Sequence, residues 1–339
     1  MARCYRPSLY LEAYSGLYWK QERRRQKRLM QTASSWTRPG WRFLAVEKNM
    51  DSVVYECENL KQEDIACLEK LQSDLGILAD LSRADVLVYC LLTAERAVAV
   101  SQASPHSILP LHNETQLEQR VSSTDEPAVL RALVEGQPTV MEVRRGSSQR
   151  ATPDKGAPVV QETYPVRSDD GRVIAAVCIE TNLIERERHH RRSKVFQRAL
   201  RQFQESVLTG GLQGTERLSP FAEHDGVVVV DAQHRIQYVS GIATSLYRKL
   251  GYAGNLVKRH IDDLELDDNR LVREALEACE CFERELGVRN LVWVKKAIPL
   301  FTMGRGLRRL LPRSEASRRM EGVLLTIRDE TDSRRQDEE

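Results

Sequence analysis

The chain has 339 residues, of which 41% are hydrophobic and 29% charged, and its formal net charge is +2. This composition is ordinary for a soluble globular protein, and the length allows two hydrophobic cores. Because no run of 18 apolar residues occurs, the sequence predicts no membrane-spanning helix. Glu12 interrupts the apolar stretch near the N-terminus, which argues against a secretory signal, so we expect a cytoplasmic protein.

The first 50 residues differ in composition from the rest. They hold eleven Lys and Arg residues against three acidic ones, and three of the four tryptophans (Trp19, Trp36 and Trp41). Arginines interleaved with aromatic residues could bind nucleic acid or an anionic membrane surface. The segment has no sustained periodicity, however, and we predict a poorly ordered basic aromatic extension over residues 1–58.

The seven cysteines are odd in number and scattered along the chain. Cys90 and Cys178 lie inside apolar runs and are expected to be buried, free thiols. Cys279 and Cys281 form a C-x-C pair without a second cysteine pair or spaced histidines, so no zinc site is predicted. A reducing cytosol is the natural compartment for such a pattern, and no metal or cofactor is expected.

The region 59–182 begins with a helix and continues into two hairpins. Leu68, Leu71, Leu75 and Leu78 recur at steps of three and four residues, as on one face of an amphipathic helix. The pattern changes abruptly at residue 86, where the run "VLVYCLL" predicts a buried strand paired with "VAVSQAS". A second hairpin is predicted around the Ser168–Gly171 turn. Between the hairpins we expect one helix at 126–136 and a polar loop.

The region after residue 182 repeats this plan. A single helix is predicted over 183–212, ended by Gly210 and Gly211. Residues 213–333 then give a hairpin, a helix, a stretch of short helices from 260 to 288 and two long strands, and residues 334–339 form a polar tail. The sequence therefore predicts an α+β protein with two tandem domains, each an antiparallel sheet with helices, joined by a long helix.

The phrase "ILADLSRAD" (residues 77–85) resembles the start of the GAF-like domain in cytosolic sensor histidine kinases of the PdtaS/EutW type. The second region resembles a PAS domain, through the hairpin "HDGVVVVDAQHRIQYVS" and the D-x-T exit at Asp329 and Thr331. The resemblance covers roughly residues 59–333. It implies a GAF-like domain at 59–182, a linker helix at 183–212 and a PAS-like domain at 213–333.

The resemblance implies a signal-sensing module of a two-component phosphorelay pathway that transmits through helices. In this family the PAS domain is followed by a phosphoacceptor helix and an ATP-binding domain, but this sequence holds no Gly-rich nucleotide loop. The pair His189-His190 lacks the sequel expected of the family's acceptor. We therefore expect a sensor half without kinase activity, acting on a separate kinase or response regulator.

Candidate site residues follow from the strand periodicity and from the resemblance. Asp80 and Asp85 are expected to be structural, because aspartates at a helix-to-strand junction bond nearby backbone amides. His260 occupies the position at which some haem-binding PAS domains place their iron ligand, but a lone histidine gives no haem site. The inward-facing positions predicted to line a small-molecule pocket in the PAS-like domain are Val228, Val230, Ile236, Tyr238, Ile242 and Leu246.

Two features concern partners. Val195, Leu200, Phe203 and Val207 form an apolar face on the linker helix, and we expect a homodimer through such flanking helices. The segment 302–322 is rich in arginine and could bind phosphate or another acidic group, or be a solvated hairpin extension. The alternative function is therefore a nucleic-acid or anionic-surface binder that uses the basic N-terminus and the 302–322 hairpin.

Overall fold

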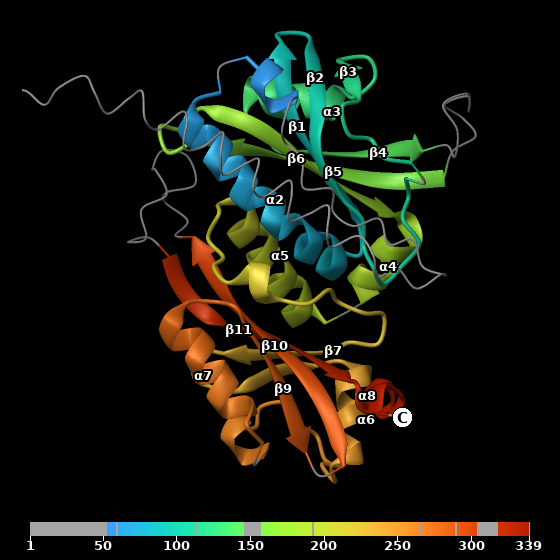
Figure 1. Cartoon of the computed structure of the whole chain (residues 1–339), viewed down its shortest axis with the longest axis vertical. Coiled ribbons are helices and arrows are strands. Elements are labelled where there is room, and N and C mark those ends of the chain that lie inside the picture. The colour runs from blue at the N-terminus through green and yellow to red at the C-terminus, as the bar shows by residue number, and fades with distance from the viewer. Residues whose placement is uncertain are drawn as a thin grey trace, which may run out of the picture. The chain divides into compact units, whose positions relative to one another are not determined.

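Two antiparallel sheets form the framework of the chain and are drawn in Figure 1. Both lie within one unit, Lys48–Glu339. The residues that this computed structural model describes are 53–58, 60–112, 114–145, 157–191, 193–264, 266–288, 290–303 and 318–338.

The first sheet has six strands in the order β3-β2-β1-β6-β5-β4. Its two central strands, β1 and β6, are almost entirely buried, as expected for the two apolar runs that form them. The strands are β1 (Asp85–Thr93), β2 (Arg96–Ala103), β3 (Arg120–Ser122), β4 (Thr139–Arg145), β5 (Ala157–Arg167) and β6 (Val173–Asn182). The short helix η1 (Val53–Glu56) precedes this sheet, and α3 (Pro127–Glu135) connects β3 to β4.

The helix α2 (Gln62–Ser82) leads directly into β1, and its C-terminal end explains the abrupt change of pattern there. Arg83 adopts the left-handed conformation (φ 51°), and its N–H bonds the carbonyl of Asp80. The next amide, Ala84 N–H, bonds the carbonyl of Ala79. These two bonds make a Schellman motif, which satisfies the last helical carbonyls and reverses the chain into the strand.

The second sheet has five strands in the order β8-β7-β11-β10-β9. Its strands are β7 (Gly226–Asp231), β8 (Ile236–Val239), β9 (Phe282–Val288), β10 (Leu291–Met303) and β11 (Arg318–Asp329). The helices that accompany it are η2 (Thr215–Arg217), α6 (Gly241–Lys249), η3 (Ile261–Leu264), α7 (Asp268–Ala278) and α8 (Thr331–Glu338).

The two sheets share one connectivity. In each sheet the first two strands form a hairpin (β1 with β2, and β7 with β8). The last strand of the region then pairs with the first (β6 with β1, and β11 with β7), and the two strands before it continue the sheet to its edge (β5 and β4, and β10 and β9). The first sheet has β3 as an additional edge strand beside β2. Every strand pairing is antiparallel, so the predicted α+β class with two antiparallel sheets is confirmed.

The single helix predicted over 183–212 is wrong, because two helices, α4 (Leu183–Arg191) and α5 (Lys194–Leu208), occupy this stretch. Ser193 is the reason for the break. Its backbone is extended (ψ 140°), and its side-chain hydroxyl accepts a hydrogen bond from Val195 N–H, so it serves as the N-cap of a new helix.

The core between the sheets is built on α2 and α5. Figure 1 shows α5 beside α2 and next to β10, and these elements are in contact. One hydrophobic cluster includes Leu75 from α2, Phe203 from α5 and Ile298 from β10, all fully buried. A second cluster lies between the first sheet and α3, and a third joins the second sheet to α6 and α7. The two sheets therefore share a core through these helices.

This core changes two expectations. The apolar face proposed for dimerisation is used internally, because Phe203 and Val207 are fully buried and Val195 and Leu200 pack against the same cluster. That face is therefore not available to a partner. Val54 and Cys57 also belong to this cluster, so residues 53–58 of the predicted extension are part of the fold; the remainder of the extension lies outside the described residues.

Three strands were not predicted from the sequence. β3 and β4 lie in a stretch expected to be irregular, and β9 lies where short helices were expected. All three are edge strands, and the side chains of β4 alternate between partly buried and exposed. Within the described residues, no helix has the length and apolar character needed to cross a membrane.

Candidate functional site

Strand register gathers polar side chains on the face of the first sheet that α3 covers. Glu180 of β6 lies directly opposite Asp85 of β1 on one side and Gln161 of β5 on the other. Residues opposite one another in an antiparallel sheet share a face, so these three side chains are neighbours. Glu180 and Gln161 are fully buried, and Asp85 is 1% exposed. Such groups must be hydrogen-bonded or paired to be tolerated.

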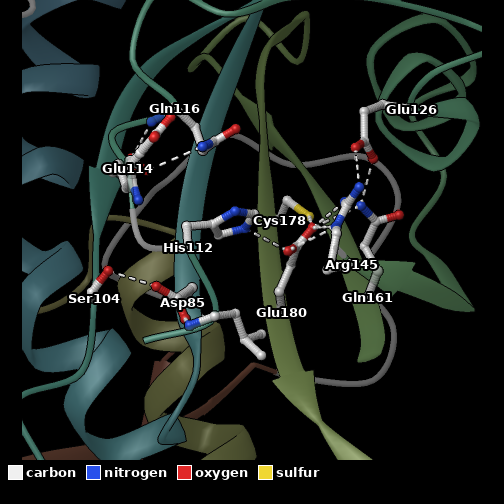
Figure 2. Close-up of polar contacts among 12 residues, drawn as sticks. Asp85, Ser104, His112, Glu114, Gln116, Glu126, Arg145, Gln161, Cys178 and Glu180 are labelled. Atoms are coloured by element: carbon white, nitrogen blue, oxygen red, sulfur yellow. Dashed lines mark hydrogen bonds and ion pairs between the residues drawn. The ribbon is translucent and has the colours of Figure 1, made fainter. Parts of the chain in front are cut away.

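Glu180 is the centre of this cluster, and Figure 2 shows Arg145 and His112 reaching it from two sides. The Nε atom of Arg145 lies 3.1 Å from each carboxylate oxygen of Glu180. The same guanidinium donates from Nη1 to Glu126, at 2.6 Å. One arginine therefore pairs with two buried carboxylates. Glu180 lies near the C-terminal end of β6, and Glu126 directly precedes α3.

Gln161 completes the arrangement but is not itself satisfied. Its side-chain nitrogen donates to Glu126 at 2.7 Å and to Glu180 at 3.2 Å. Its side-chain oxygen, Oε1, is buried and has no hydrogen-bond partner within the described residues. A buried acceptor without a donor carries a desolvation penalty, which a ligand with an N–H or O–H group would relieve.

His112 approaches Glu180 from the loop between β2 and β3, with Nε2 at 2.8 Å from the carboxylate. Burial disfavours the charged imidazolium, yet the hydrogen bond and charge of Glu180 raise the pKa of His112. Burial likewise opposes ionisation of Glu180, but the bond from His112 and the charge of Arg145 lower its pKa to about 2. The carboxylate is thus ionised and held between the Arg145 guanidinium and the His112 imidazole.

The loop that carries His112 is fastened to the end of α2 and the start of β1 by the two aspartates of the "LADLSRAD" phrase. We refer to residues 104–112 as the β2–β3 loop. Asp85 accepts hydrogen bonds from Ser104 Oγ and from Leu111 N–H, both at 2.6 Å. Burial raises the pKa of Asp85, although these two hydrogen bonds oppose the shift.

Asp80 holds the middle of the same loop and also contacts the second half of the chain. One carboxylate oxygen accepts from His106 N–H at 2.7 Å, and the other accepts from Phe221 N–H at 3.0 Å. The ring nitrogen Nδ1 of His106 lies 3.1 Å from this carboxylate as well. Phe221 belongs to the segment that leads into β7, so a single side chain connects the β2–β3 loop to the second sheet.

The side chains around Glu180 are suited to binding a polar group through hydrogen bonds. Burial raises the pKa of the Cys178 thiol, 3.7 Å from Glu180, well above its usual value, and a protonated thiol is a poor nucleophile. The described residues include no group of three or more His, Cys, Asp or Glu side chains placed to hold a metal ion. Arginine, two carboxylates, an amide and an imidazole can instead exchange hydrogen bonds with a polar ligand.

The six positions proposed as pocket lining in the second region fall into two groups. Val228, Val230 and Ile236 are fully buried in the hydrophobic cluster under α6 and α7, and Leu246 belongs to the same cluster. Tyr238 and Ile242 instead line a cavity of about 310 Å³ in which Asp80 also takes part. The structure thus brings Asp80, Tyr238 and Ile242 together and leaves the other three valine and isoleucine positions in the packed core.

The remaining candidates lie apart from both places. Asp329 accepts hydrogen bonds from Thr331 N–H and Thr331 Oγ at the start of α8, and its second oxygen bonds Lys249 of α6 at 2.8 Å. Thr331 Oγ in turn accepts from Val292 N–H. His260 is partly exposed, lies 3.2 Å from Asp262 and stacks on His234.

Four residues of the cluster were not predicted from the sequence: Glu180, Arg145, Glu126 and Gln161. The available signal was the position of Glu180 within the apolar run "IAAVCIET", since a carboxylate in a central strand requires a partner. The partner could not be identified from the sequence, because Arg145 lies 35 residues earlier on the edge strand β4.

Comparisons with known proteins agree with this fold. The family model for the GAF domain of histidine kinase PdtaS matches residues 50–199. A solved structure of the "Sensor region of a sensor histidine kinase" has a TM-score of 0.60 at 19% identity, covering 84% of this chain and 99% of that chain. No curated protein matches the chain. The resemblance to sensor histidine kinases of the PdtaS type is therefore confirmed.

Two smaller structures also match over parts of the chain. The PAS domain of histidine kinase ThkA covers 31% of this chain and 99% of its own, with 20% identity and a TM-score of 0.22. A domain of an HTR-like protein from Haloarcula marismortui covers 31% of this chain and 97% of its own, with 18% identity and a TM-score of 0.22. The match with a TM-score of 0.60 shows the fold of the chain.

Proposed function

We propose that the chain is a cytoplasmic sensing module of a two-component pathway, in which the GAF-like first sheet detects a signal and the PAS-like second sheet passes it on. The match to the PdtaS GAF domain supports the sensing role. The observation that carries the proposal is the pair of hydrogen bonds at Asp80, because they tie the β2–β3 loop to Phe221 at the start of the second sheet.

The Glu180 cluster is the detecting end of this path. A polar ligand or partner group that donates to Gln161 Oε1 or competes for Glu180 changes the bond between Glu180 and His112. His112 ends the β2–β3 loop, so its displacement acts on the bonds that hold the loop to Asp85 and Asp80. A ligand shifts the populations of two arrangements only if it binds them unequally, so its contacts with Glu180 and Gln161 must differ between the arrangement with the Asp80 bonds and the one without them.

The output end is the segment around Phe221. Its N–H bonds Asp80, while the carbonyl of Pro220 accepts hydrogen bonds from Arg328 of β11 at 2.6 Å and Lys296 of β10 at 3.2 Å. β11 leads directly to the Asp329–Thr331 cap of α8. A change at Asp80 therefore reaches the two longest strands of the second sheet and the helix at their end.

A chimeric kinase tests this proposal. We would place the chain before the phosphoacceptor and ATP-binding regions of a PdtaS-type histidine kinase and measure autophosphorylation with labelled ATP. Glu180→Gln should change the rate at least about threefold, because loss of one charged hydrogen bond is worth about 1.5 kcal/mol or more. Glu142→Gln, an exposed glutamate on β4, is the matched control. Equal rates for both variants would refute the proposed role of the cluster.

The same assay on the chain alone tests whether it lacks catalytic activity. The 339 residues hold no Gly-rich nucleotide loop, so we expect no phosphate incorporation. Incorporation at His189, His190 or elsewhere would show a kinase function. Dimerisation remains a prediction, with the α5 face removed from consideration. The alternative function depends on residues 1–50 and 302–322, most of which lie outside the described residues.

A further inference from the structure

The cavity of about 310 Å³ beside Asp80 lies away from the Glu180 cluster and is lined by residues of both sheet regions. The end of α2 and the β2–β3 loop supply one wall, with Asp80 and Ser107. The other wall comes from α5, from the segment after Pro220 and from β8, with Phe196, Phe221 and Tyr238. Its volume is at the small end of the range for ligand pockets, which often occur at boundaries between domains.

The apolar part of the lining is aromatic. The rings of Phe196 and Tyr238 lie 5.6 Å apart between centroids and are tilted by 45°, and Phe221 adds a third ring. Aromatic faces carry partial negative charge, so they attract both planar ligands and cations. A ring with a positive group therefore suits this wall better than an aliphatic anion.

Two polar groups are available to such a ligand. Ser107 is 8% exposed, and its hydroxyl has no hydrogen-bond partner within the described residues. Asp80 accepts from two backbone amides and one imidazole nitrogen, whereas an ionised carboxylate offers about four acceptor positions. A ligand with two N–H donors could satisfy both groups, and the buried Ser107 hydroxyl is a reason for one to bind there.

The charges around the cavity favour a cation. Among the lining residues, Arg83 is paired with Glu185 at 2.7 Å, and Asp225 is paired with Arg328 at 2.7 Å. Asp80 and Glu223 are the remaining acidic lining residues. His106 offsets Asp80 when it is protonated, whereas Glu223 is exposed and forms no ion pair within the described residues. The ammonium of Lys296 lies 4.5 Å from the centre of the Phe221 ring and 3.9 Å from Asp225, so it offsets Asp225 together with Arg328. An anionic ligand would lie beside the carboxylates of Asp80 and Glu223.

We propose that this cavity is a second ligand site that binds a small aromatic cation, with its ring against Phe196 and Tyr238 and its N–H groups donating to Ser107 Oγ and Asp80. Because the walls come from both sheet regions and Asp80 also holds Phe221, a bound ligand stabilises the arrangement in which the two regions are joined.

Three probes of nearly equal shape test the charge preference. Benzamidine is a planar cation, benzamide is neutral and benzoate is an anion. We would titrate the full chain with each and follow binding by ligand-observed NMR and by amide shifts of His106, Ser107 and Phe221. Benzamidine should bind at least about fivefold more tightly than benzamide, and benzoate more weakly than both. Benzoate binding as tightly as benzamidine would overturn the proposal.

Two serine substitutions test the place of binding. Ser107→Ala removes a hydroxyl that makes no bond within the described residues, so the fold is kept while benzamidine affinity falls by about fivefold. Ser101→Ala on β2 is the matched control, because its hydroxyl is also buried without a described partner but does not line the cavity. An equal effect of both variants contradicts the assignment. The readout is binding, so this result is independent of the chimeric kinase assay.

Discussion

The two sheets follow one connectivity, yet each buries charge differently on its outer face. The first sheet holds Glu180 in a shared network with Arg145 and His112, which come from an edge strand and a loop. The second sheet holds Lys295 in a closed pair with Asp268 of α7, and both side chains are fully buried. Tyr247 Oη donates to the same aspartate at 2.7 Å. Repetition of a fold therefore does not repeat its chemistry.

The two buried charged groups differ in whether their hydrogen-bond partners could be replaced by those of a ligand. In the Glu180 cluster one acceptor, Gln161 Oε1, is left without a described partner, and the donor His112 lies on the β2–β3 loop, outside the strands. In the second sheet the Lys295 ammonium lies over the rings of Tyr247 and Trp293, and both charged partners are fully buried, although Trp293 Nε1 also lacks a described partner. The first arrangement suits detection of a signal, and the second suits a fixed core.

The largest expected effect comes from breaking the closed pair. Lys295→Met leaves the Asp268 carboxylate buried without its cation, and we expect the free energy of unfolding to fall by about 3–5 kcal/mol. Urea denaturation followed by circular dichroism measures this. Lys296→Met is the matched control: its neighbour Asp225 keeps Arg328, so the loss should be less than half as large.

A double substitution that removes both buried charges tests the same pair. Lys295→Met combined with Asp268→Asn removes both charges, and we expect it to recover at least half of the lost stability. A loss below about 1 kcal/mol in the single variant would contradict the view that this pair is a fixed part of the core.

The next effect concerns α2, the helix between the two sheets. Asp74 is fully buried; burial raises its pKa to about 6, although the hydrogen bond from Thr215 opposes the shift. The folded state then binds more protons than the unfolded one, so stability falls as pH rises from about 4 to about 6. Asp74→Asn should be more stable than the natural chain at pH 8, by up to about 3 kcal/mol.

Urea denaturation of the natural chain and of Asp74→Asn at pH 4 and pH 8 checks this interpretation of Asp74. At pH 4 the carboxyl is largely protonated in the folded chain, so the natural chain and Asp74→Asn should unfold at nearly the same urea concentration. A variant that is less stable at pH 8 would show that the ionised carboxylate is favourable where it lies.

A smaller effect on stability is expected from two histidines of the β2–β3 loop, His106 and His112. The pKa of His106 is raised, chiefly by its hydrogen bond to Asp80, and that of His112 is raised by Glu180 despite burial. The stability that each contributes is fully present below the unfolded value of about 6.5 and is lost as pH rises through the folded pKa.

We therefore expect His112→Asn and His106→Asn each to flatten the fall in stability above pH 6.5, by about 1 kcal/mol or less, and the double variant to flatten it further. Thermal unfolding at pH 6 and pH 8 measures the slope. An unchanged slope in the double variant would show that these carboxylate contacts do not persist in solution.

Sequence patterns predicted much of the framework, because periodicity reports burial. The spacing of apolar residues identified the helix α2, the strands of the hairpins β1–β2 and β5–β6, and the two long strands β10 and β11. The break at Ser193 was missed because charged residues on both sides suit a helix, and only the local cap separates α4 from α5. β3, β4 and β9 were missed because they are edge strands, which need few apolar residues.

The candidate sites were harder to predict than the fold. Glu180 and Lys295 both stand inside apolar strand runs, which signals a buried charge but not its partner. Asp80 was expected to bond nearby amides, and it does bond amides, but from His106 and Phe221, which are 26 and 141 residues away. Such long-range bonds depend on how the β2–β3 loop and the second sheet are placed, and a single sequence does not contain that information.

The most direct test of the coupling measures amide hydrogen exchange in the natural chain, in Glu180→Gln and in Glu142→Gln. Loosening the cluster should weaken both bonds that Asp80 accepts, so the amides of His106 and Phe221 should exchange at least about threefold faster in Glu180→Gln and remain unchanged in Glu142→Gln. If His106 is accelerated and Phe221 is not, the first sheet does not signal to the second through Asp80.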